Sequence, residues 1–304
     1  MPAITRSQMN KELWPGLKAL FGLTYNRYSP QYTDIFETMS SDKKFEQLQK
    51  ISGFGTAPIK TEGSAIFYDT SQEVYTTTFT HATIAYGYSV TQEAVEDNLY
   101  ESLMTRYTKA LGRGMMNTKE TIGANVLNNA FSASYLGGDG KRLCATDHPL
   151  VYGGVNSNRP ASGADLNETA LENAVNQVAG WTDDRGILIC AKVDKLIIPQ
   201  AYNFTAERLL KTILRTGTAD NDINAINSKG SIPGGYVVNN RLTDTNAWFL
   251  KTDIPDGMIY FNRIGLSYDK EGDFDTGNFR AKARERYSFG WADPLGIFGS
   301  PGSS

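Results

Sequence analysis

Histidine and cysteine are scarce in this chain, with two of each in 304 residues. The histidines are His81 and His148, and the cysteines are Cys144 and Cys190. The two cysteines lie far apart in the sequence, so they form neither a paired-cysteine motif nor a disulfide framework. We therefore expect two reduced thiols. Because only four residues are histidine or cysteine, few positions could form a catalytic or metal site that uses them.

Long apolar runs are also lacking. No stretch approaches the ~18 apolar residues of a membrane span, and residues 1–21 lack the apolar core of a signal peptide. We expect a protein without membrane association that is made and kept in a cytosol-like compartment. The net charge is −3, and Lys and Arg are scattered rather than gathered into runs. This pattern disfavours sequence-specific DNA recognition.

The catalytic sequence motifs of nucleotide-binding enzymes, zinc proteases and serine hydrolases are absent as well. One stretch, LCATDHP at 143–149, still brings Cys144, Asp147 and His148 within five positions. A cysteine nucleophile needs a base that a third group orients, and this stretch lies in a connection rich in Gly and Pro. Zinc would need further ligands, and the spare candidates Cys190 and His81 lie in predicted strands. We expect a structural turn, with no catalytic, cofactor-binding or metal-binding residues.

A second acidic stretch, DKEGDFDT at 269–276, loosely resembles a calcium-binding loop. It lacks the Gly at the sixth position and the Glu at the twelfth that an EF-hand requires. We interpret it as a solvated acidic turn.

Residues 63–90 are rich in Thr, Tyr, Val, Ile and Phe, with turn residues at 69–71, which predicts a long β-hairpin. Neither face of the predicted ribbon is continuously apolar. Because an isolated hairpin is marginally stable at best, we expect this ribbon to lie on another chain.

Residues 91–134 predict one very long helix. Apolar residues recur at helical spacing through the segment: Val95, Leu99, Leu103, Tyr107, Leu111, Met115, Ile122, Val126 and Ala130. Its ~44 residues would span roughly 65 Å at 1.5 Å per residue, against an average globular helix of ~11–12 residues. An elongated molecule is therefore expected.

The segment after it alternates between helix and strand and predicts a compact α/β unit. We expect a helix at 166–180 capped near Asp165 or Asn167, two buried strands within 187–199, and a helix at 201–217 that ends at Gly217. A polar loop then precedes strands at 236–240 and 247–252. The last stretch, 257–300, carries further strand-like runs.

Several stretches match a known family in the expected order: YSVTQEAVEDNLYESL, TKETIGANVLNNAF, DGKRLCATDHPLVYGG, NDINAIN, LTDTNAWFLKTD and FDTGNF. The chain resembles the major capsid (major head) proteins of tailed bacteriophages, and more closely their Mu-like branch. The resemblance implies an α+β fold of the Hong Kong 97 type. Its parts would be an N-terminal arm at 1–50, an extended β-hairpin loop at 51–90, a spine helix at 91–134, a peripheral domain at 135–164 and 256–304, and an axial domain at 165–255.

The resemblance implies that copies of this chain form pentamers and hexamers of an icosahedral shell that encloses double-stranded DNA without sequence-specific binding. Portal, scaffolding and cementing proteins are the other implied partners, and the virion capsid is the implied location, with the host cytoplasm before assembly. No cofactor is implied, and the family attributes no catalysis to the LCATDHP loop.

The chain departs from the family's pattern in two ways. It lacks the long coiled scaffolding segment of some members, so we expect scaffolding to be a separate protein. The founding member crosslinks through a lysine in the extended loop, whereas the expected tip here, YDTSQEVY, has none, and Lys60 is expected nearer the base. This predicts a non-covalent shell.

Two alternatives stay open at this point. In the first, the chain has the same fold but forms an encapsulin-like nanocompartment shell that encloses an enzyme instead of DNA. The other is a cysteine-dependent hydrolase with Cys144 as nucleophile and His148 as base.

Overall fold

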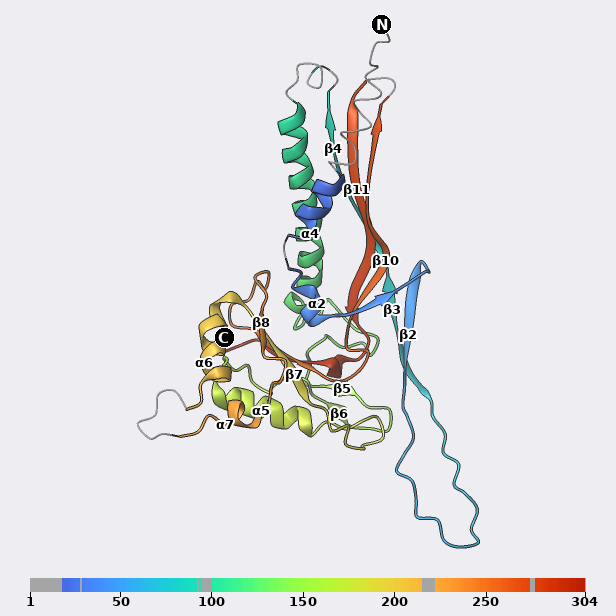
Figure 1. The fold of residues 1–304 in the computed structure, drawn as a ribbon. Helices are drawn as coiled ribbons and strands as arrows, with labels where there is room; N and C mark the ends of the chain where they lie inside the picture. The colour runs from blue at the N-terminus through green and yellow to red at the C-terminus, as the bar shows by residue number, and fades with distance from the viewer. Residues whose placement is uncertain are drawn as a thin grey trace.

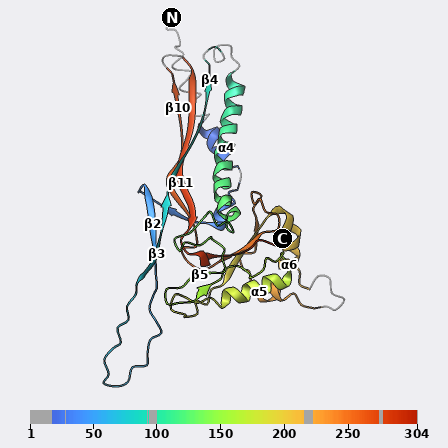
Figure 2. The same cartoon turned by 180° about the vertical axis from the view of Figure 1, so that it is seen from behind.

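The molecule is elongated and has three parts (Figure 1). The computed structural model describes residues 18–27, 29–91, 93, 100–214, 222–273 and 277–303. A long helix and long strands form a neck, a second sheet with its helices forms a rounded body, and a two-stranded ribbon hangs beside the body. Figure 2 shows the same three parts from behind.

The neck is a four-stranded sheet with α4 (Tyr100–Asn128) packed along it. The strand order is β1 (Glu37–Ser40), β10 (Met258–Gly272), β11 (Phe279–Trp291) and β4 (Ala82–Val90). β1 is parallel to β10, and the other neighbouring pairs are antiparallel. Helix and sheet share a buried apolar cluster of Phe21, Leu111, Met115, Tyr268, Ala281 and Ala283.

The predicted long helix is confirmed over the 29 residues of α4, but its expected end near residue 134 is wrong. The helix ends at Asn128, where the side chain donates to the carbonyl of Arg241 at 3.1 Å, and a turn follows in which the Ala130 N–H donates to Leu127. Of the predicted apolar face, Leu111 and Met115 are buried, whereas Tyr107 is exposed. Val95 and Leu99 lie outside the described residues.

The body contains the second four-stranded sheet, in the order β12 (Ile297–Ser300), β9 (Trp248–Thr252), β7 (Val193–Ile198) and β8 (Tyr236–Val238). Helices α5 (Glu168–Ala179), α6 (Asn203–Lys211) and α7 (Ala225–Lys229) accompany it, and the short turns η1 (Gln200–Tyr202) and η2 (Pro294–Gly296) precede α6 and β12. The predicted cap of α5 is confirmed, because Asn167 accepts a hydrogen bond from the Ala170 N–H. The strands predicted at 236–240 and 247–252 are confirmed as β8 and β9.

Three expectations for the body are wrong. The first of the two strands predicted within 187–199 does not form: Leu188 is exposed, and Cys190 has a left-handed backbone with φ 56°. The helix after β7 ends at Lys211, because Thr212 is extended; Gly217 lies outside the described residues. The expected polar loop before β8 contains α7, whose start is capped by the Asn224 side chain.

The ribbon comprises residues 45–80, with β2 (Phe45–Ile51) antiparallel to β3 (Glu73–Thr80). The prediction that residues 63–90 pair with each other is therefore wrong. β4 pairs with β11 in the neck instead, because the chain changes partner at His81 between the two strands. The far turn of the ribbon lies at 61–64, where the Ser64 N–H donates to Thr61. The expected tip at 68–75 is therefore not the far turn but the segment that leads into β3, and Lys60 stands beside the far turn.

The stretch at 269–276 is also not an acidic turn in its first half. Asp269 and Glu271 lie in β10, opposite Lys282 and Arg280 of β11. Their two-residue spacing places them on one face of β10, where each faces a basic residue across the strand pair, while Arg280 forms its ion pair with Asp273. Residues 274–276 lie outside the described part of the chain. The remaining elements are a helical segment at 18–25, α2 (Tyr32–Ile35), and the small hairpin β5 (His148–Pro149) with β6 (Val155–Asn156).

Candidate functional site

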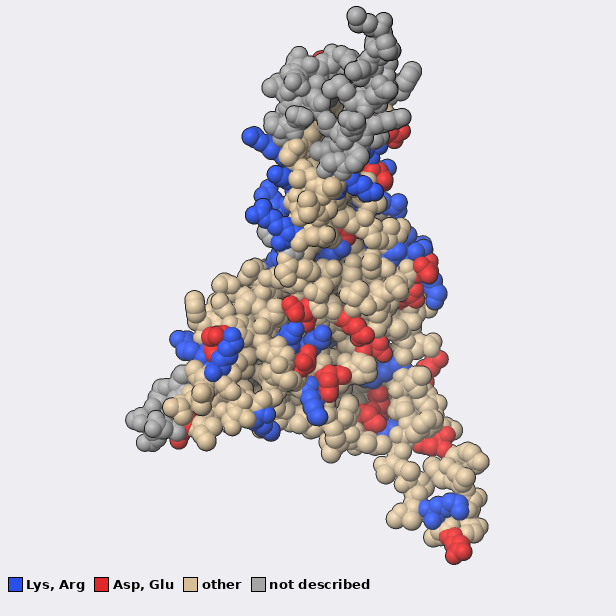
Figure 3. Space-filling view, viewed as in Figure 1, with Lys and Arg blue, Asp and Glu red and all other residues tan. Residues whose placement is uncertain are grey.

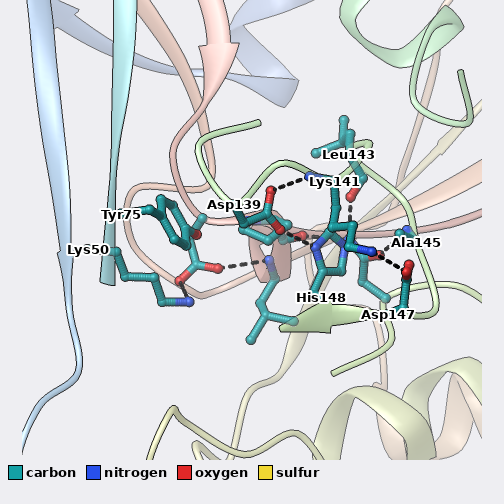
Figure 4. A network of polar contacts seen from close by, with 12 residues as sticks. Lys50, Tyr75, Asp139, Lys141, Leu143, Ala145, Asp147 and His148 are labelled. Atoms are coloured by element: carbon teal, nitrogen blue, oxygen red, sulfur yellow. Dashed lines mark hydrogen bonds and ion pairs between the residues drawn. The ribbon is translucent and has the colours of Figure 1, made fainter. Parts of the chain in front are cut away.

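The loop that carries Cys144 and His148 lies where neck, body and ribbon meet (Figure 4). Both ring nitrogens of His148 have partners: Nδ1 lies 2.6 Å from Oδ2 of Asp139, and Nε2 lies 3.0 Å from Oδ1 of Asn158. The Asn158 amide orientation is fixed, because Oδ1 also accepts from the Ala145 N–H at 2.8 Å while Nδ2 donates to the carbonyls of Leu143, Pro294 and Ile297. The ring is thus fully used as a structural crosslink.

These contacts occupy both nitrogens of the His148 ring. An amide oxygen only accepts, so Nε2 is the donor to Asn158. Nδ1 is engaged by the Asp139 carboxyl group, so neither ring nitrogen is free to take a proton from a neighbouring thiol.

Cys144 is fully buried and is held against the last strand of the body. Its N–H donates to Ala130 at 2.9 Å, and a Cβ placed on Gly299 would lie 2.7 Å from its Sγ. Burial raises the pKa of the Cys144 thiol far above its ordinary value, although nearby arginines oppose the shift. A nucleophilic cysteine needs the thiolate, so this environment suits packing and not catalysis.

The other candidate groups are dispersed. Asp147 forms an ion pair with Lys141, and Cys190 is exposed in a bend of the body. His81 lies at the ribbon base, with Nδ1 3.0 Å from Ser288 Oγ and Nε2 2.9 Å from Ser41 Oγ. Across the part of the chain that the structure describes, no three His, Cys, Asp or Glu side chains are arranged to hold a metal ion. In that same part, no helix is long and apolar enough to cross a bilayer.

The ribbon is anchored to this junction at its base. Lys50 forms an ion pair with Asp293 at 2.9 Å, and the Tyr75 hydroxyl donates to the Ala292 carbonyl at 3.2 Å (Figure 4). Burial, together with the negative charges of Asp293 and Asp139, raises the pKa of Tyr75, so its hydroxyl stays a donor. The base also shares an apolar cluster with the neck: Phe79, Ile259, Phe261 and Ala292.

Glycine allows the loop to approach the ribbon closely. A Cβ on Gly138 would lie 2.5 Å from Oγ1 of Thr77 and 2.7 Å from the ring of Tyr75. A larger side chain would require Thr77, Tyr75 or the loop itself to shift, so Gly138 permits the close contact between the loop and the ribbon base.

Beyond its base the ribbon packs against little of its own chain. Arg185 of the body reaches Asp69 at 3.5 Å, and Asp69 accepts from the Gly55 N–H at 2.7 Å. Every residue from 56 to 68 is exposed. This stretch and its flanks carry six exposed large apolar side chains: Ile51, Phe54, Ile59, Ile66, Phe67 and Tyr68. Apolar groups gathered on one extended segment mark an interaction surface.

A second exposed apolar group lies at the far end of the body. Ile213, Leu214 and Ile223 are exposed where Leu214 and Ile223 form an isolated β-bridge, and Phe204 of α6 is 75% exposed. The molecule thus presents apolar surface at two separate extremities, the ribbon and this body tip.

The N-terminal segment is held to the neck by a buried cation. Lys119 of α4 forms an ion pair with Glu285 of β11 and donates to the Tyr25 hydroxyl at 2.6 Å. Its Nζ lies within 6 Å of the ring centroids of four tyrosines: Tyr25, Tyr32, Tyr260 and Tyr287. Such cation–π contacts strengthen when they are desolvated, so Tyr25 and Tyr32 are held to the neck by charge as well as by packing.

Sequence reasoning placed the ribbon's exposed character correctly but missed Asn158, Lys119 and Gly138. Their roles depend on partners far away in the chain, and no local pattern indicates them. The one available signal was the doublet Gly137-Gly138 after the long helix, which marks a close backbone approach.

Comparison with known proteins gives a consistent result. The family model for phage capsid protein matches residues 73–299. No curated protein matches the sequence significantly. Among solved structures, a virus-like particle from Pyrococcus furiosus matches with a TM-score of 0.55 and 12% identity over 94% of this chain and 98% of that one.

Two further structures match over most of both chains. The capsid of cyanophage P-SCSP1u gives a TM-score of 0.57 at 11% identity and covers 89% of this chain and 87% of that one. The capsid of a native GTA particle gives 0.55 at 13% identity and covers 90% of each. At these identities the structures establish a shared fold, the mixed α+β architecture of Hong Kong 97-like capsids.

Proposed function

This chain belongs to the phage capsid protein family, and on that premise we propose how it builds a shell around double-stranded DNA. It is a major capsid protein, a structural component of the virion capsid whose copies assemble into a shell. The Mu-like branch stays a prediction. The observation that supports the mechanism is the ribbon, whose exposed stretch at 56–68 has no cover within its own chain.

In the proposed assembly, the ribbon lies across a neighbouring copy and buries its apolar side chains there. Full burial of one such side chain is worth about 1.5–3 kcal/mol, so six of them contribute a large share of one contact. Interfaces beyond ~2,000 Å² are typical of obligate assemblies, and an extended ribbon reaches that area without a large globular face.

The parts of the subunit follow the expected division, which we retain as a proposal with amended bounds. Residues 45–80 take the place of the extended loop, α4 is the spine, and the body is the axial domain. The body tip with Ile213 and Ile223 would then meet its equivalents around the five-fold and six-fold axes. The exposed apolar side chains at this tip support that placement.

The remaining partners are proposed from the family alone: a portal, separate scaffolding and cementing proteins, and packaged double-stranded DNA that the shell encloses without sequence-specific binding. The host cytoplasm is the proposed site before assembly. We also propose that the chain has no enzymatic activity. The burial of Cys144 and the engaged nitrogens of His148 support this, because they remove the hydrolase's nucleophile and base.

Electron microscopy of the purified protein tests the proposal. Uniform closed shells are expected, together with loss of shells but not of solubility when residues 56–68 are replaced by a short Gly-Ser linker. A compact monomer at all concentrations would contradict the shell. Shells from the native source that hold an enzyme cargo and no DNA would favour the nanocompartment alternative.

A further inference from the structure

From Met104 to Asn128, the exposed charged residues of α4 are all basic. Arg106, Lys109 and Arg113 are exposed and lie three to seven positions apart, which places them along one side of the helix. The two other charged residues between Met104 and Asn128, Lys119 and Glu120, are both buried. Lys and Arg gather along the neck over α4 in the space-filling view (Figure 3).

Arg27 joins these three side chains from a different segment. A cavity of about 340 Å³ is lined by Thr24, Arg27, Arg106, Lys109, Ala110 and Arg113. None of the four basic residues takes part in the ion pairs found between described residues. No carboxylate among the described residues joins these four cations, which repel one another, so the arrangement suits an anion that another molecule supplies.

The hollow continues along the helix. Arg113 also lines a neighbouring depression with Asn117, Glu120 and Arg241. Glu120 is its one acid, and it is buried with Oε1 accepting from the Gln31 N–H at 2.7 Å. Burial raises the pKa of Glu120, which disfavours its negative charge. The potential of the whole groove is therefore positive.

The chain as a whole has the opposite balance, with 30 basic and 33 acidic residues. A positive groove on such a chain is a local feature rather than part of a general basic surface. Three cations over seven residues of helix span about 10 Å, and a DNA duplex presents one phosphate per ~1.7 Å of its axis. A duplex lying along α4 would thus offer phosphates at every basic position.

We propose that the groove formed by Arg27, Arg106, Lys109 and Arg113 binds the phosphate backbone of double-stranded DNA, and that this face of α4 lines the inside of the shell. The inference rests on the proposed function, which supplies an enclosed duplex. Contacts to phosphates carry no base information, so the binding is independent of sequence.

Salt-dependent binding of the unassembled full-length protein to a fluorescent duplex tests the proposal. With four phosphate contacts, raising salt from about 50 to about 200 mM weakens binding about 100-fold, whereas with one contact left it weakens only about threefold. The triple variant Arg106→Gln, Lys109→Gln, Arg113→Gln should show the smaller change. The matched control Lys192→Gln, Arg208→Gln, Lys229→Gln removes three exposed charges from the body and should behave as wild type.

Each outcome supports or overturns the assignment. An unchanged salt slope in the α4 variant, or an equal loss in the control, would overturn it. If the protein bound polyglutamate of matched charge more tightly than the duplex, the groove would be assigned to an acidic protein partner, and the DNA proposal would be overturned. If the triple variant precipitates, Arg113→Gln alone should lower the salt slope by about one.

Shell formation is measured separately on the same samples. Closed shells from wild type and both variants, combined with a lost DNA response in the α4 variant, support both proposals. Closed shells with an unchanged response overturn only the DNA groove, and a protein that forms no shells overturns the proposed function. Duplex added outside preformed closed shells should stay unbound; binding there would overturn the inward placement of α4.

Discussion

The exposed half of the ribbon should govern assembly and leave the stability of the single subunit untouched. Ile59 is 96% exposed and Phe67 is 67% exposed, and both lie in the stretch where no residue is covered by its own chain. The variant Ile59→Ser, Phe67→Ser removes both apolar side chains. Because neither contributes to the core, the free energy of unfolding of the unassembled subunit should change by less than about 0.5 kcal/mol.

The double substitution instead weakens the association of subunits with one another. Full burial of one Ile or Phe side chain stabilises a contact by about 1.5–3 kcal/mol. Ile59 and Phe67 are not fully exposed beforehand and are not fully covered in a contact, so together they contribute about 2–4 kcal/mol to the free energy of association. At about 1.4 kcal/mol per tenfold, the subunit concentration at which shells form should rise roughly 30- to 1,000-fold.

Light scattering over a concentration series measures this threshold, and thermal unfolding of the unassembled subunit measures the control quantity. The variant Tyr135→Ser, Leu136→Ser removes two apolar side chains that are 53% and 58% exposed outside the ribbon, and should shift the threshold little. An unshifted threshold for the ribbon variant, or a loss of subunit stability comparable to the assembly effect, would refute the reasoning.

Four further tests follow. Lys119→Met strands the buried Glu285 carboxylate and should cost about 3–5 kcal/mol in chemical unfolding, with much of this restored by the double variant Lys119→Met, Glu285→Gln; equal losses would show that the pair is not coupled. His81 has a pKa lowered below its ordinary 6.5, chiefly by burial, so the folded state binds fewer protons, and stability should be full above pH 6.5 and decline as pH falls through the lowered pKa. The variant His81→Gln should show a flatter decline, and an unchanged pH profile would assign the acid sensitivity elsewhere. Iodoacetamide should label the exposed Cys190 in the native protein and Cys144 only in denaturant, as mass spectrometry of both forms would detect; rapid native labelling of Cys144 would revive the hydrolase hypothesis. The non-covalent shell stays a prediction although its lysine argument is wrong, since Lys60 lies beside the far turn; one monomer band from boiled shells is expected on a denaturing gel, and a ladder of multimers would contradict it.

The sequence predicted those features of the fold that depend on local periodicity. The run of apolar residues through Leu111 and Met115 specified α4, and Asn167 marked the start of α5, because caps and helical faces are set by near neighbours. It failed where pairing is non-local. β3 and β4 are both rich in β-branched and aromatic residues, and only the distant β2 and β11 decide that each strand pairs with a different partner.

The site divides in the same way. Loop composition predicted a structural turn around Cys144 and His148, but the Asn158 amide that joins this loop to the C-terminal strand region lies elsewhere in the chain. The basic groove was missed for a related reason. In the sequence, Lys and Arg are scattered and form no visible cluster. Only the helix brings Arg106, Lys109 and Arg113 to one side, and only the fold places Arg27 beside them.

The ribbon is anchored at one end and uncovered at the other, and this division favours assembly. Its base is fixed by the Phe79 cluster, by the Lys50–Asp293 ion pair and by the close approach at Gly138. Association must compensate for the ordering of every segment it immobilises, so a base that is ordered beforehand lowers the free-energy cost of each contact. Burial of the apolar side chains in the uncovered stretch from 56 to 68 then compensates for the remaining cost of ordering that stretch on a neighbour. The variant Gly138→Ala, which crowds Thr77 and Tyr75 of β3 without removing an exposed apolar side chain, should therefore weaken assembly in the same direction as removing Phe67 does.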